Sequence, residues 1–146
     1  MEGEIALHGI GVVSSPVATI EFTDWADVVS EIRLDEALVP GLRGLEEYSH
    51  IIVVFHLHRV HFNPATDLVR HPRDRADWPL TGVFATHTQF RPNPIGITTV
   101  KLLGIADNVL SVKGLDALNG TVVLDIKPYM PDLEIAEVAV APQWIK

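Results

Sequence analysis

Short β-rich segments separated by turn signals run through almost all of this chain of 146 residues. Apolar alternation and short apolar runs predict strands at 7–14, 29–34, 51–57, 83–87, 98–105, 109–114, 121–127 and 134–141. The sequences Ala106-Asp107-Asn108 and Leu118-Asn119-Gly120 are typical of hairpin turns. Because unpaired strand edges are a liability, many short strands are most stable when their sheet closes on itself. The sequence therefore predicts a mainly β fold, built as a small closed or nearly closed β-barrel.

Helices are expected to be few and short. The candidates are residues 23–29, where Asp24 can cap the first turn, and residues 44–49. Prolines at positions 64, 72 and 79, with charged residues between them, predict a long surface loop over 62–80, and a loop of that length is often functional. No repeat or linker divides the sequence, so we expect a single domain over residues 1–146.

The composition excludes several classes of protein. There is no cysteine, which excludes disulfides and thiolate metal sites, and no G-x-G-x-x-G follows a strand, so a Rossmann nucleotide site has no support. The most apolar run, 51–55, is far too short to span a bilayer, and the N-terminus does not look like a signal peptide. We therefore expect a cytoplasmic protein with no membrane partner.

Basic residues gather in one middle stretch although the net charge is −8. Eleven Lys and Arg stand against nineteen Asp and Glu, which argues against a protein that coats nucleic acid by bulk charge. A local basic face remains compatible with this composition, and its candidate RNA-binding residues are Arg59, Arg70, Arg73 and Arg75. An ordinary solvated face is the alternative interpretation.

The segment FATHTQFRPNPIG, residues 84–96, is unusually stiff. Pro92 and Pro94 fix their own φ and push Arg91 and Asn93 toward extended geometry. The Arg91 guanidinium can offer a planar fork to a carboxylate or phosphate, and the Asn93 side chain can hydrogen-bond to the edge of a base. We interpret the segment either as a rigid wall of a binding site or as a plain rigid connection between strands.

Three histidines near the end of the predicted strand 51–57 generate a metal hypothesis. His56 and His58 would point to the same strand face, at a spacing that lets two imidazoles reach one metal ion, and His61 would supply a third ligand. Histidine pairs on strands are more often ordinary polar groups. We therefore assign no metal ion and keep a metal-binding module as an alternative function.

A polar strand face is predicted within LNGTVVLDIKPYMP, residues 118–131. Strand alternation places Asp125, Lys127 and Tyr129 on one face and apolar side chains on the other. These three residues are candidates to line a cleft. The alternative is a half-buried strand with a single ion pair between Asp125 and Lys127.

Four stretches of the sequence resemble one known family: GIGVVSSP at 9–16, GLRGLEEYSHIIVVFHLHR at 41–59, GVFATHTQFRPNPIG at 82–96 and GLDALNGTVVLDIKPYMP at 114–131. They are similar to the TsaA-like, or TrmO, family, for which the RPNPIG and LDIKPY elements are very specific. The resemblance implies a single small β-barrel, usually a homodimer, that binds S-adenosyl-L-methionine without a Rossmann sheet. It also implies a methyltransferase that uses this cofactor for N6-methylation of threonylcarbamoyl-adenosine beside the tRNA anticodon.

Carried over residue by residue, the resemblance implies a set of cofactor-binding residues. They are His58, Arg59, His87, Arg91, Pro92, Asn93, Pro94, Asn119, Gly120, Thr121 and Val122. Family members commonly have arginine at the position of His87, and Asp and Pro at the positions of Asn119 and Val122. The family's Pro-Arg-Gln element is not visible between residues 17 and 38, and the chain ends near Lys146 without the C-terminal extension of the longer bacterial forms.

Methyl transfer requires mainly alignment, which supplies about 7–11 kcal/mol, so no catalytic base is assigned. The first hypothesis is therefore a tRNA methyltransferase with S-adenosyl-L-methionine as cofactor. A second is a methyltransferase or binding protein of the same fold with a non-tRNA substrate. A third, from a different class, is the metal-binding module built on His56, His58 and His61.

Overall fold

The computed structural model describes residues 3–21 and 23–145. The chain divides into two compact units. The barrel unit comprises Met1–His58 and Ile95–Tyr129, and the loop unit comprises Arg59–Pro94 and Met130–Lys146. Each unit therefore joins two segments that lie far apart in the sequence.

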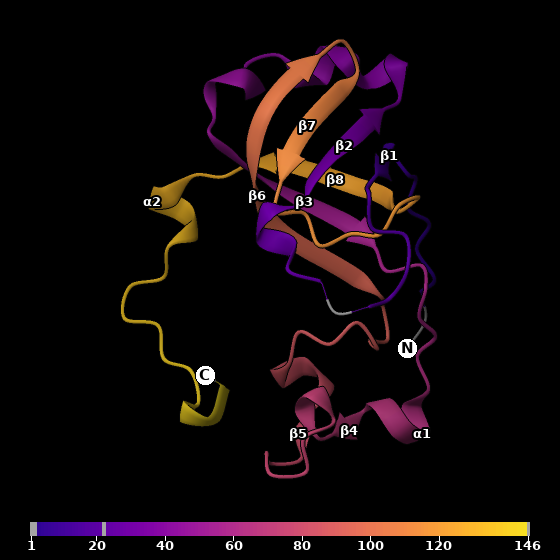
Figure 1. Cartoon of the computed structure of the whole chain (residues 1–146), viewed down its shortest axis with the longest axis vertical. Coiled ribbons are helices and arrows are strands. Elements are labelled where there is room, and N and C mark those ends of the chain that lie inside the picture. Colours follow the sequence, from indigo (N-terminus) through magenta and orange to yellow (C-terminus); the bar gives the residue numbers. More distant parts are fainter. Residues whose placement is uncertain (1–2, 22, 146) are drawn as a thin grey trace. The chain divides into compact units, whose positions relative to one another are not determined.

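Six strands of the barrel unit form a closed antiparallel barrel in the order β1-β2-β7-β6-β3-β8 (Figure 1). The strands are β1 (Gly11–Ser14), β2 (Val29–Leu34), β3 (His50–His56), β6 (Ile95–Ala106), β7 (Val109–Lys113) and β8 (Val122–Pro128). The barrel is closed because β8 pairs with β1 as well as with β3. The prediction of a mainly β fold with a closed barrel is confirmed, and closure removes the free edges of this sheet.

Apolar side chains fill the interior of the barrel. Along β2, Ser30, Ile32 and Leu34 are buried and the residues between them are exposed, as expected for a strand with one inward face. The largest fully buried apolar side chains are Phe55, Ile32, Ile51, Leu110 and Leu115. Burial of one such side chain contributes about 1.5–3 kcal/mol. Because the interior is packed, a ligand site of the barrel unit has to lie at its surface.

The two short helices predicted for the barrel unit are present as 3₁₀ helices. One spans Trp25–Asp27, and Asp24 caps it by accepting a hydrogen bond from Ala26 N at 3.2 Å. The other spans Leu45–Glu47. A longer 3₁₀ helix at Glu36–Leu42 has no counterpart in the sequence prediction.

Of the two predicted hairpin turns, only the first joins paired strands. The turn at Asp107, which has φ of 54°, connects β6 with its neighbour β7. The turn at Asn119-Gly120 is also present, but it lies between β7 and β8, which do not pair with each other. The hairpin prediction is therefore wrong there, because the chain crosses from one side of the barrel to the other between these strands.

The loop unit contains only short elements. They are α1 (Pro64–Asp67), β4 (Val69–Arg70), a 3₁₀ helix at Pro72–Asp74, β5 (Thr81–Gly82), a 3₁₀ helix at Val83–Ala85, α2 (Pro131–Glu134) and a 3₁₀ helix at Gln143–Ile145. The predicted long loop over 62–80 thus includes α1 and β4, which pairs with β5 in a two-stranded sheet. In the described part of the chain, no helix is long and apolar enough to cross a membrane.

Two strand predictions are wrong. Residues 83–87 begin with a 3₁₀ turn, in which the Thr86 amide and hydroxyl both donate to Val83 O. Residue 134 ends α2, and residues 135–141 follow it without pairing, although the sequence of 134–141 alternates. An alternating segment becomes a strand only where it pairs with a sheet edge, and residues 135–141 pair neither with the closed barrel nor with the two-stranded sheet of β4 and β5.

The glycine of the RPNPIG motif, Gly96, packs against a core aromatic ring. It is opposite Phe55 in the register of β3 and β6. A β-carbon added to Gly96 would lie 2.5 Å from two atoms of the Phe55 ring. Since Phe55 is only 2% exposed, its ring cannot move aside without opening the core.

Gly96→Ala is expected to lower the free energy of unfolding by about 1–3 kcal/mol, because the added methyl group overpacks the Phe55 ring. Urea unfolding followed by circular dichroism measures the effect. Gly104→Ala is the matched control, since it is also on β6 and an added β-carbon there meets nothing within 4 Å. Equal unfolding midpoints for the two variants would contradict the packing role of Gly96.

Candidate functional site

The turn at Asn119 and Gly120 is tied to the chain around β1. The Asn119 amide donates to Val17 O at 2.8 Å, and its side-chain Oδ1 accepts from Ser15 N at 3.1 Å. The Gly120 amide donates to Val13 O at 2.8 Å, with φ of 84° in the left-handed region that favours glycine. The asparagine thus provides the same kind of oxygen acceptor that an aspartate would offer here.

Thr121 and His58, which are 63 residues apart in the sequence, meet beside this turn. The Thr121 hydroxyl donates to Leu118 O at 2.6 Å, and its Oγ1 lies 3.4 Å from His58 Nδ1. Thr121 is 2% exposed, whereas His58 is half-buried. A β-carbon at Gly9 would come within 2.5 Å of Val122 Cγ1, so Val122 also has a fixed packing partner. Two of the predicted cofactor segments therefore lie side by side in the barrel unit.

In the loop unit, the Arg91 side chain hydrogen-bonds to three backbone carbonyl groups of the segment 83–88. Its Nη1 donates to the carbonyl oxygens of Val83 at 3.1 Å, Thr86 at 2.6 Å and Thr88 at 3.4 Å. Hydrogen bonds to a charged donor are stronger than neutral ones, so this cluster fixes the path of the segment. It also explains why residues 83–87 do not form the predicted strand.

The other predicted residues of this region lie nearer the surface. His87, Pro92 and Asn93 are exposed, and Pro94 is half-buried. The Arg91 guanidinium hydrogen-bonds to backbone carbonyl groups of its own unit. Its binding to a carboxylate or phosphate of a ligand remains a prediction. His87 belongs to the segment that Arg91 holds, so the position of the imidazole depends on the hydrogen bonds of Arg91.

A bulge in β8 decides which of its side chains share a face. The register shifts between Val54, which pairs with Asp125, and Phe55, which pairs with Val123. Beyond the bulge, Asp125 and Lys127 share one face, with Oδ2 and Nζ 2.8 Å apart. The hydrogen bond and charge of Asp125 raise the pKa of Lys127 above its ordinary value. The single ion pair expected from the sequence is therefore present.

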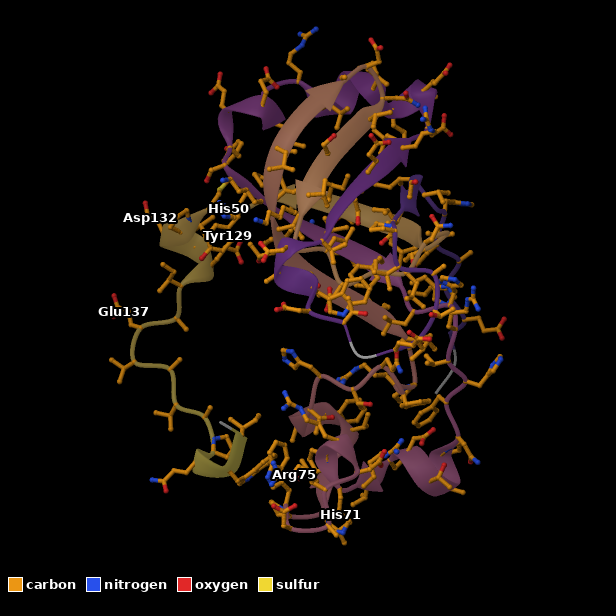
Figure 2. All side chains as sticks on the ribbon, in the orientation of Figure 1. His50, His71, Arg75, Tyr129, Asp132 and Glu137 are labelled. Atoms are coloured by element: carbon orange, nitrogen blue, oxygen red, sulfur yellow. The ribbon has the colours of Figure 1, made fainter. Side chains whose placement is uncertain are left out.

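Tyr129 lies beyond the end of β8 and is separate from that pair. Its ring contacts His50 edge-on, with ring centroids 6.4 Å apart, and Figure 2 shows the two side chains together. The strand alternation that placed Tyr129 with Asp125 and Lys127 does not extend to it. The cleft-lining role of the three residues stays a prediction.

The metal hypothesis is wrong. Strand β3 ends at His56, so strand alternation does not carry on to His58, which lies in a turn. Among residues 3–21 and 23–145, no group of three or more His, Cys, Asp or Glu side chains is arranged to hold a metal ion. His56, His58 and His61 therefore do not form a three-ligand site.

Neighbouring carboxylates pair with two of the arginines of the predicted basic face. Arg70 contacts Asp67 at 3.3 Å and Asp74 at 2.7 Å. Arg75 contacts Asp77 at 2.6 Å, and this hydrogen bond lowers the pKa of the Asp77 carboxyl. The basic stretch consequently offers less uncompensated charge than the sequence predicts.

A cavity of about 690 Å³ lies within the loop unit. The segment 83–88, including His87, forms part of its wall. Its aromatic lining residues are Trp78, Phe84, Phe90 and Trp144. Sequence reasoning did not find these four, because Trp78, Phe84 and Phe90 form no motif and Trp144 lies far from them along the sequence.

The structure assigns the predicted cofactor-binding residues to two sets. The set in the barrel unit is His58, Asn119, Gly120, Thr121 and Val122. The set in the loop unit is Arg59, His87, Arg91, Pro92, Asn93 and Pro94. Hydrogen bonds hold Asn119, Gly120 and Thr121 in the first set and Arg91 in the second.

The fold and these sets define a small non-Rossmann β-barrel protein whose polar residues cluster on turns and loops outside the packed core. The family model described as the tRNA-methyltransferase O N-terminal domain matches residues 20–135. The chain belongs to this family.

Known proteins are similar over much of the chain. A probable S-adenosyl-L-methionine-binding protein of Methanothermobacter thermautotrophicus is 37% identical over 135 residues, which are 90% of this chain and 94% of that protein. The tRNA (adenine(37)-N6)-methyltransferase of Mus musculus is 42% identical over 95 residues, which are 64% of this chain and 21% of that enzyme. A crystal structure of TrmO matches with a TM-score of 0.77 at 30% identity, covering 95% of this chain and 64% of the TrmO chain. The chain thus spans slightly less than two thirds of that solved protein.

Arg91→Ala is expected to speed amide hydrogen exchange in residues 83–88 by about 5- to 100-fold, because three carbonyl groups lose a charged donor. Hydrogen exchange with mass spectrometry measures this directly. Arg33→Ala, on the exposed face of β2, is the control and should leave the segment unchanged. Equal exchange in both variants would show that Arg91 does not hold the loop.

Proposed function

We propose that this protein is an S-adenosyl-L-methionine-dependent methyltransferase that methylates N6 of threonylcarbamoyl-adenosine beside the tRNA anticodon. Its family supports the proposal, as do relatives named for binding S-adenosyl-L-methionine and for methylating adenine 37 of tRNA. The observation that carries it is the contact of Thr121 with His58 beside the Asn119 turn. This contact joins two segments that the family resemblance implies to be cofactor-binding.

The side chains at this turn fit the cofactor. S-adenosyl-L-methionine has an adenine, ribose hydroxyls and an amino-acid end, and such ligands are oriented by a few placed polar groups. The Thr121 hydroxyl, the His58 imidazole and the Asn119 amide supply donors and acceptors on a hydrogen-bonded frame. At Gly120 an added β-carbon would meet nothing within 4 Å, so a ligand can approach the backbone there. When bound, the cofactor supplies a methyl group on a sulfonium centre.

The residues of the chain contribute to the reaction chiefly by positioning. Alignment of the reacting atoms supplies about 7–11 kcal/mol, so the protein does not need an acid-base pair. Arg91 fixes the segment that carries His87, and His87 occupies the position of a proposed cofactor contact. Asn93 is exposed between two prolines, where its amide can hydrogen-bond to the edge of a base.

A methyltransferase or binding protein of the same fold with a non-tRNA substrate is the second candidate. The net charge of −8 and the pairing of Arg70 and Arg75 with carboxylates favour it, because RNA binding depends on uncompensated cations. This candidate requires cofactor binding without measurable affinity for tRNA.

We also propose that the protein is a homodimer and acts in the cytoplasm. A dimer would cover apolar side chains that β6 leaves exposed, among them Ile97, which is 67% exposed. A monomer mass in light scattering at micromolar concentration would contradict the homodimer.

Calorimetric titration should show saturable binding of S-adenosyl-L-methionine to the purified protein. His87→Arg is expected to tighten binding about three- to tenfold, since arginine is longer, permanently charged and presents a planar fork to a carboxylate. Thr121→Val is expected to weaken it, because the hydroxyl beside His58 is lost. No heat of binding in any of the three proteins would refute the cofactor assignment.

Transfer of a labelled methyl group should occur to tRNA that carries threonylcarbamoyl-adenosine. Otherwise identical tRNA with unmodified adenosine at that position is the control and should remain unlabelled. Equal labelling of both tRNAs would exclude threonylcarbamoyl-adenosine as the specific acceptor. The protein would then be a tRNA methyltransferase that acts on another position. Cofactor binding with labelling of neither would favour the second candidate.

A further inference from the structure

The ring of Trp78, which lines the cavity of the loop unit, has cationic and aromatic neighbours. The guanidinium carbons of Arg75 and Arg73 lie 4.8 Å and 5.7 Å from the centre of this ring. The ring of Trp144 lies 5.4 Å away, measured between centroids, and is tilted by 55°. His71 Nδ1 donates to Trp78 O at 2.6 Å and so fixes the backbone that carries the ring (Figure 2).

The size and the lining of this cavity suit a nucleotide. Its volume of about 690 Å³ lies in the range of small-molecule sites, about 300–1,000 Å³. Unpaired bases are bound by stacking on aromatic rings and on the planes of guanidinium groups. Trp78 and Arg73, which both line the cavity, provide both kinds of surface there, and Arg75 lies over the Trp78 ring without lining the cavity.

Arg73 supplies the charge that a phosphate requires. The neighbouring Arg70 is neutralised by Asp67 and Asp74, which line the same cavity. Arg73 is exposed, and no carboxylate of residues 3–21 or 23–145 pairs with it. One uncompensated cation therefore lies beside the stacking surface, where it would attract the phosphate of a nucleotide whose base lies on Trp78.

The backbone at Arg73 is strained in a way that places this cation. Arg73 and Asp74 have φ of 54° and 55°, a left-handed conformation that side-chain-bearing residues disfavour. Two turn hydrogen bonds hold it, from Asp74 N to His71 O at 3.0 Å and from Arg75 N to Pro72 O at 3.1 Å. Strain of this kind is concentrated at functional sites, and here its result is a guanidinium over Trp78.

The C-terminal segment reaches the cavity only near its end. Trp144 and Ile145 line the cavity, whereas Val138 and Val140 are 94% and 92% exposed. The contact between Trp144 and Trp78 therefore anchors the end of the stretch that follows α2. A flat group that stacks more favourably on Trp78 would compete with Trp144 for this ring.

We propose that the cavity around Trp78 takes an unstacked nucleotide of the RNA substrate, with its base on Trp78 and its phosphate paired with Arg73, and that Trp144 occupies the place of the base when RNA is absent. This inference rests on the proposed tRNA methyltransferase function and names residues that bind the RNA substrate. His87, a proposed cofactor contact, lines the same cavity, so a base bound there lies next to a group expected to hold the methyl donor.

Fluorescence anisotropy with an end-labelled anticodon stem-loop RNA tests the stacking site. Trp78→Ala should weaken binding about 5- to 100-fold, and Trp78→Phe should restore most of it, because both rings stack. Trp144→Ala should tighten binding about two- to tenfold, since it removes the competing ring. Leu80→Ala, at an exposed apolar residue of the same loop, is the control and should have no effect.

The salt dependence of the same titration tests the phosphate contact. Arg73→Gln should reduce the slope of log K against log salt concentration by about 0.7–1, which corresponds to one phosphate. Arg33→Gln removes one positive charge from the surface of β2 and should leave the slope unchanged.

Each outcome bears on the inference separately from the proposed function. Unchanged RNA affinity in Trp78→Ala would overturn the inference, and intact cofactor binding and methyl transfer would leave the proposed function standing. Weakened binding in both Trp78→Ala and Trp144→Ala would make the two rings a structural pair and overturn the role of Trp144. RNA binding that depends on Trp78 in a protein that binds no S-adenosyl-L-methionine would support the cavity and refute the methyltransferase. Absence of RNA binding in the wild-type protein would overturn the inference, whatever the cofactor does.

Discussion

The pairing of β1 with β8 is the constraint on which the barrel unit depends. It joins Gly11 to Val123 and Val12 to Val122, and it turns an open sheet into a closed one. The same stretch of β1 anchors the polar turn, because Val13 N donates to Thr121 O and Val13 O accepts from Gly120 N, both at 2.8 Å. Closure of the barrel and construction of the proposed cofactor turn therefore rely on a single strand interface.

Much of the barrel could be predicted from local sequence signals. The strand at Val29–Leu34 and the turn at Asp107 follow from side-chain alternation and turn chemistry, which act over a few residues. Strand pairing across the barrel is not local, so the Asn119-Gly120 turn was mistaken for a hairpin. The alternating segment 134–141 was mistaken for a strand for a related reason, since alternation does not reveal whether a partner edge exists.

The candidate site was only partly predictable. Resemblance of motifs identified His58 and Thr121, and the fold brings them together over a separation of 63 residues. The bulge in β8 and the clamp formed by Arg91 depend on packing and on carbonyl positions that no motif encodes. The cavity around Trp78 was missed because its lining joins residues 67–90 to the C-terminal Trp144, and sequence distance hides such contacts.

The position of the closing strands in the chain has a consequence for folding. Strand β1 is synthesised early and β8 late, so the hairpin of β6 and β7 can form while β1 still lacks its final partner. Until then both closing strands are open edges on which chains can associate. In a partly folded chain, the turn at Asn119 and Gly120 is consequently not yet held by β1. A ligand that binds this turn selects the closed barrel and shifts the folding equilibrium toward it by mass action, so the cofactor would also act as a folding aid.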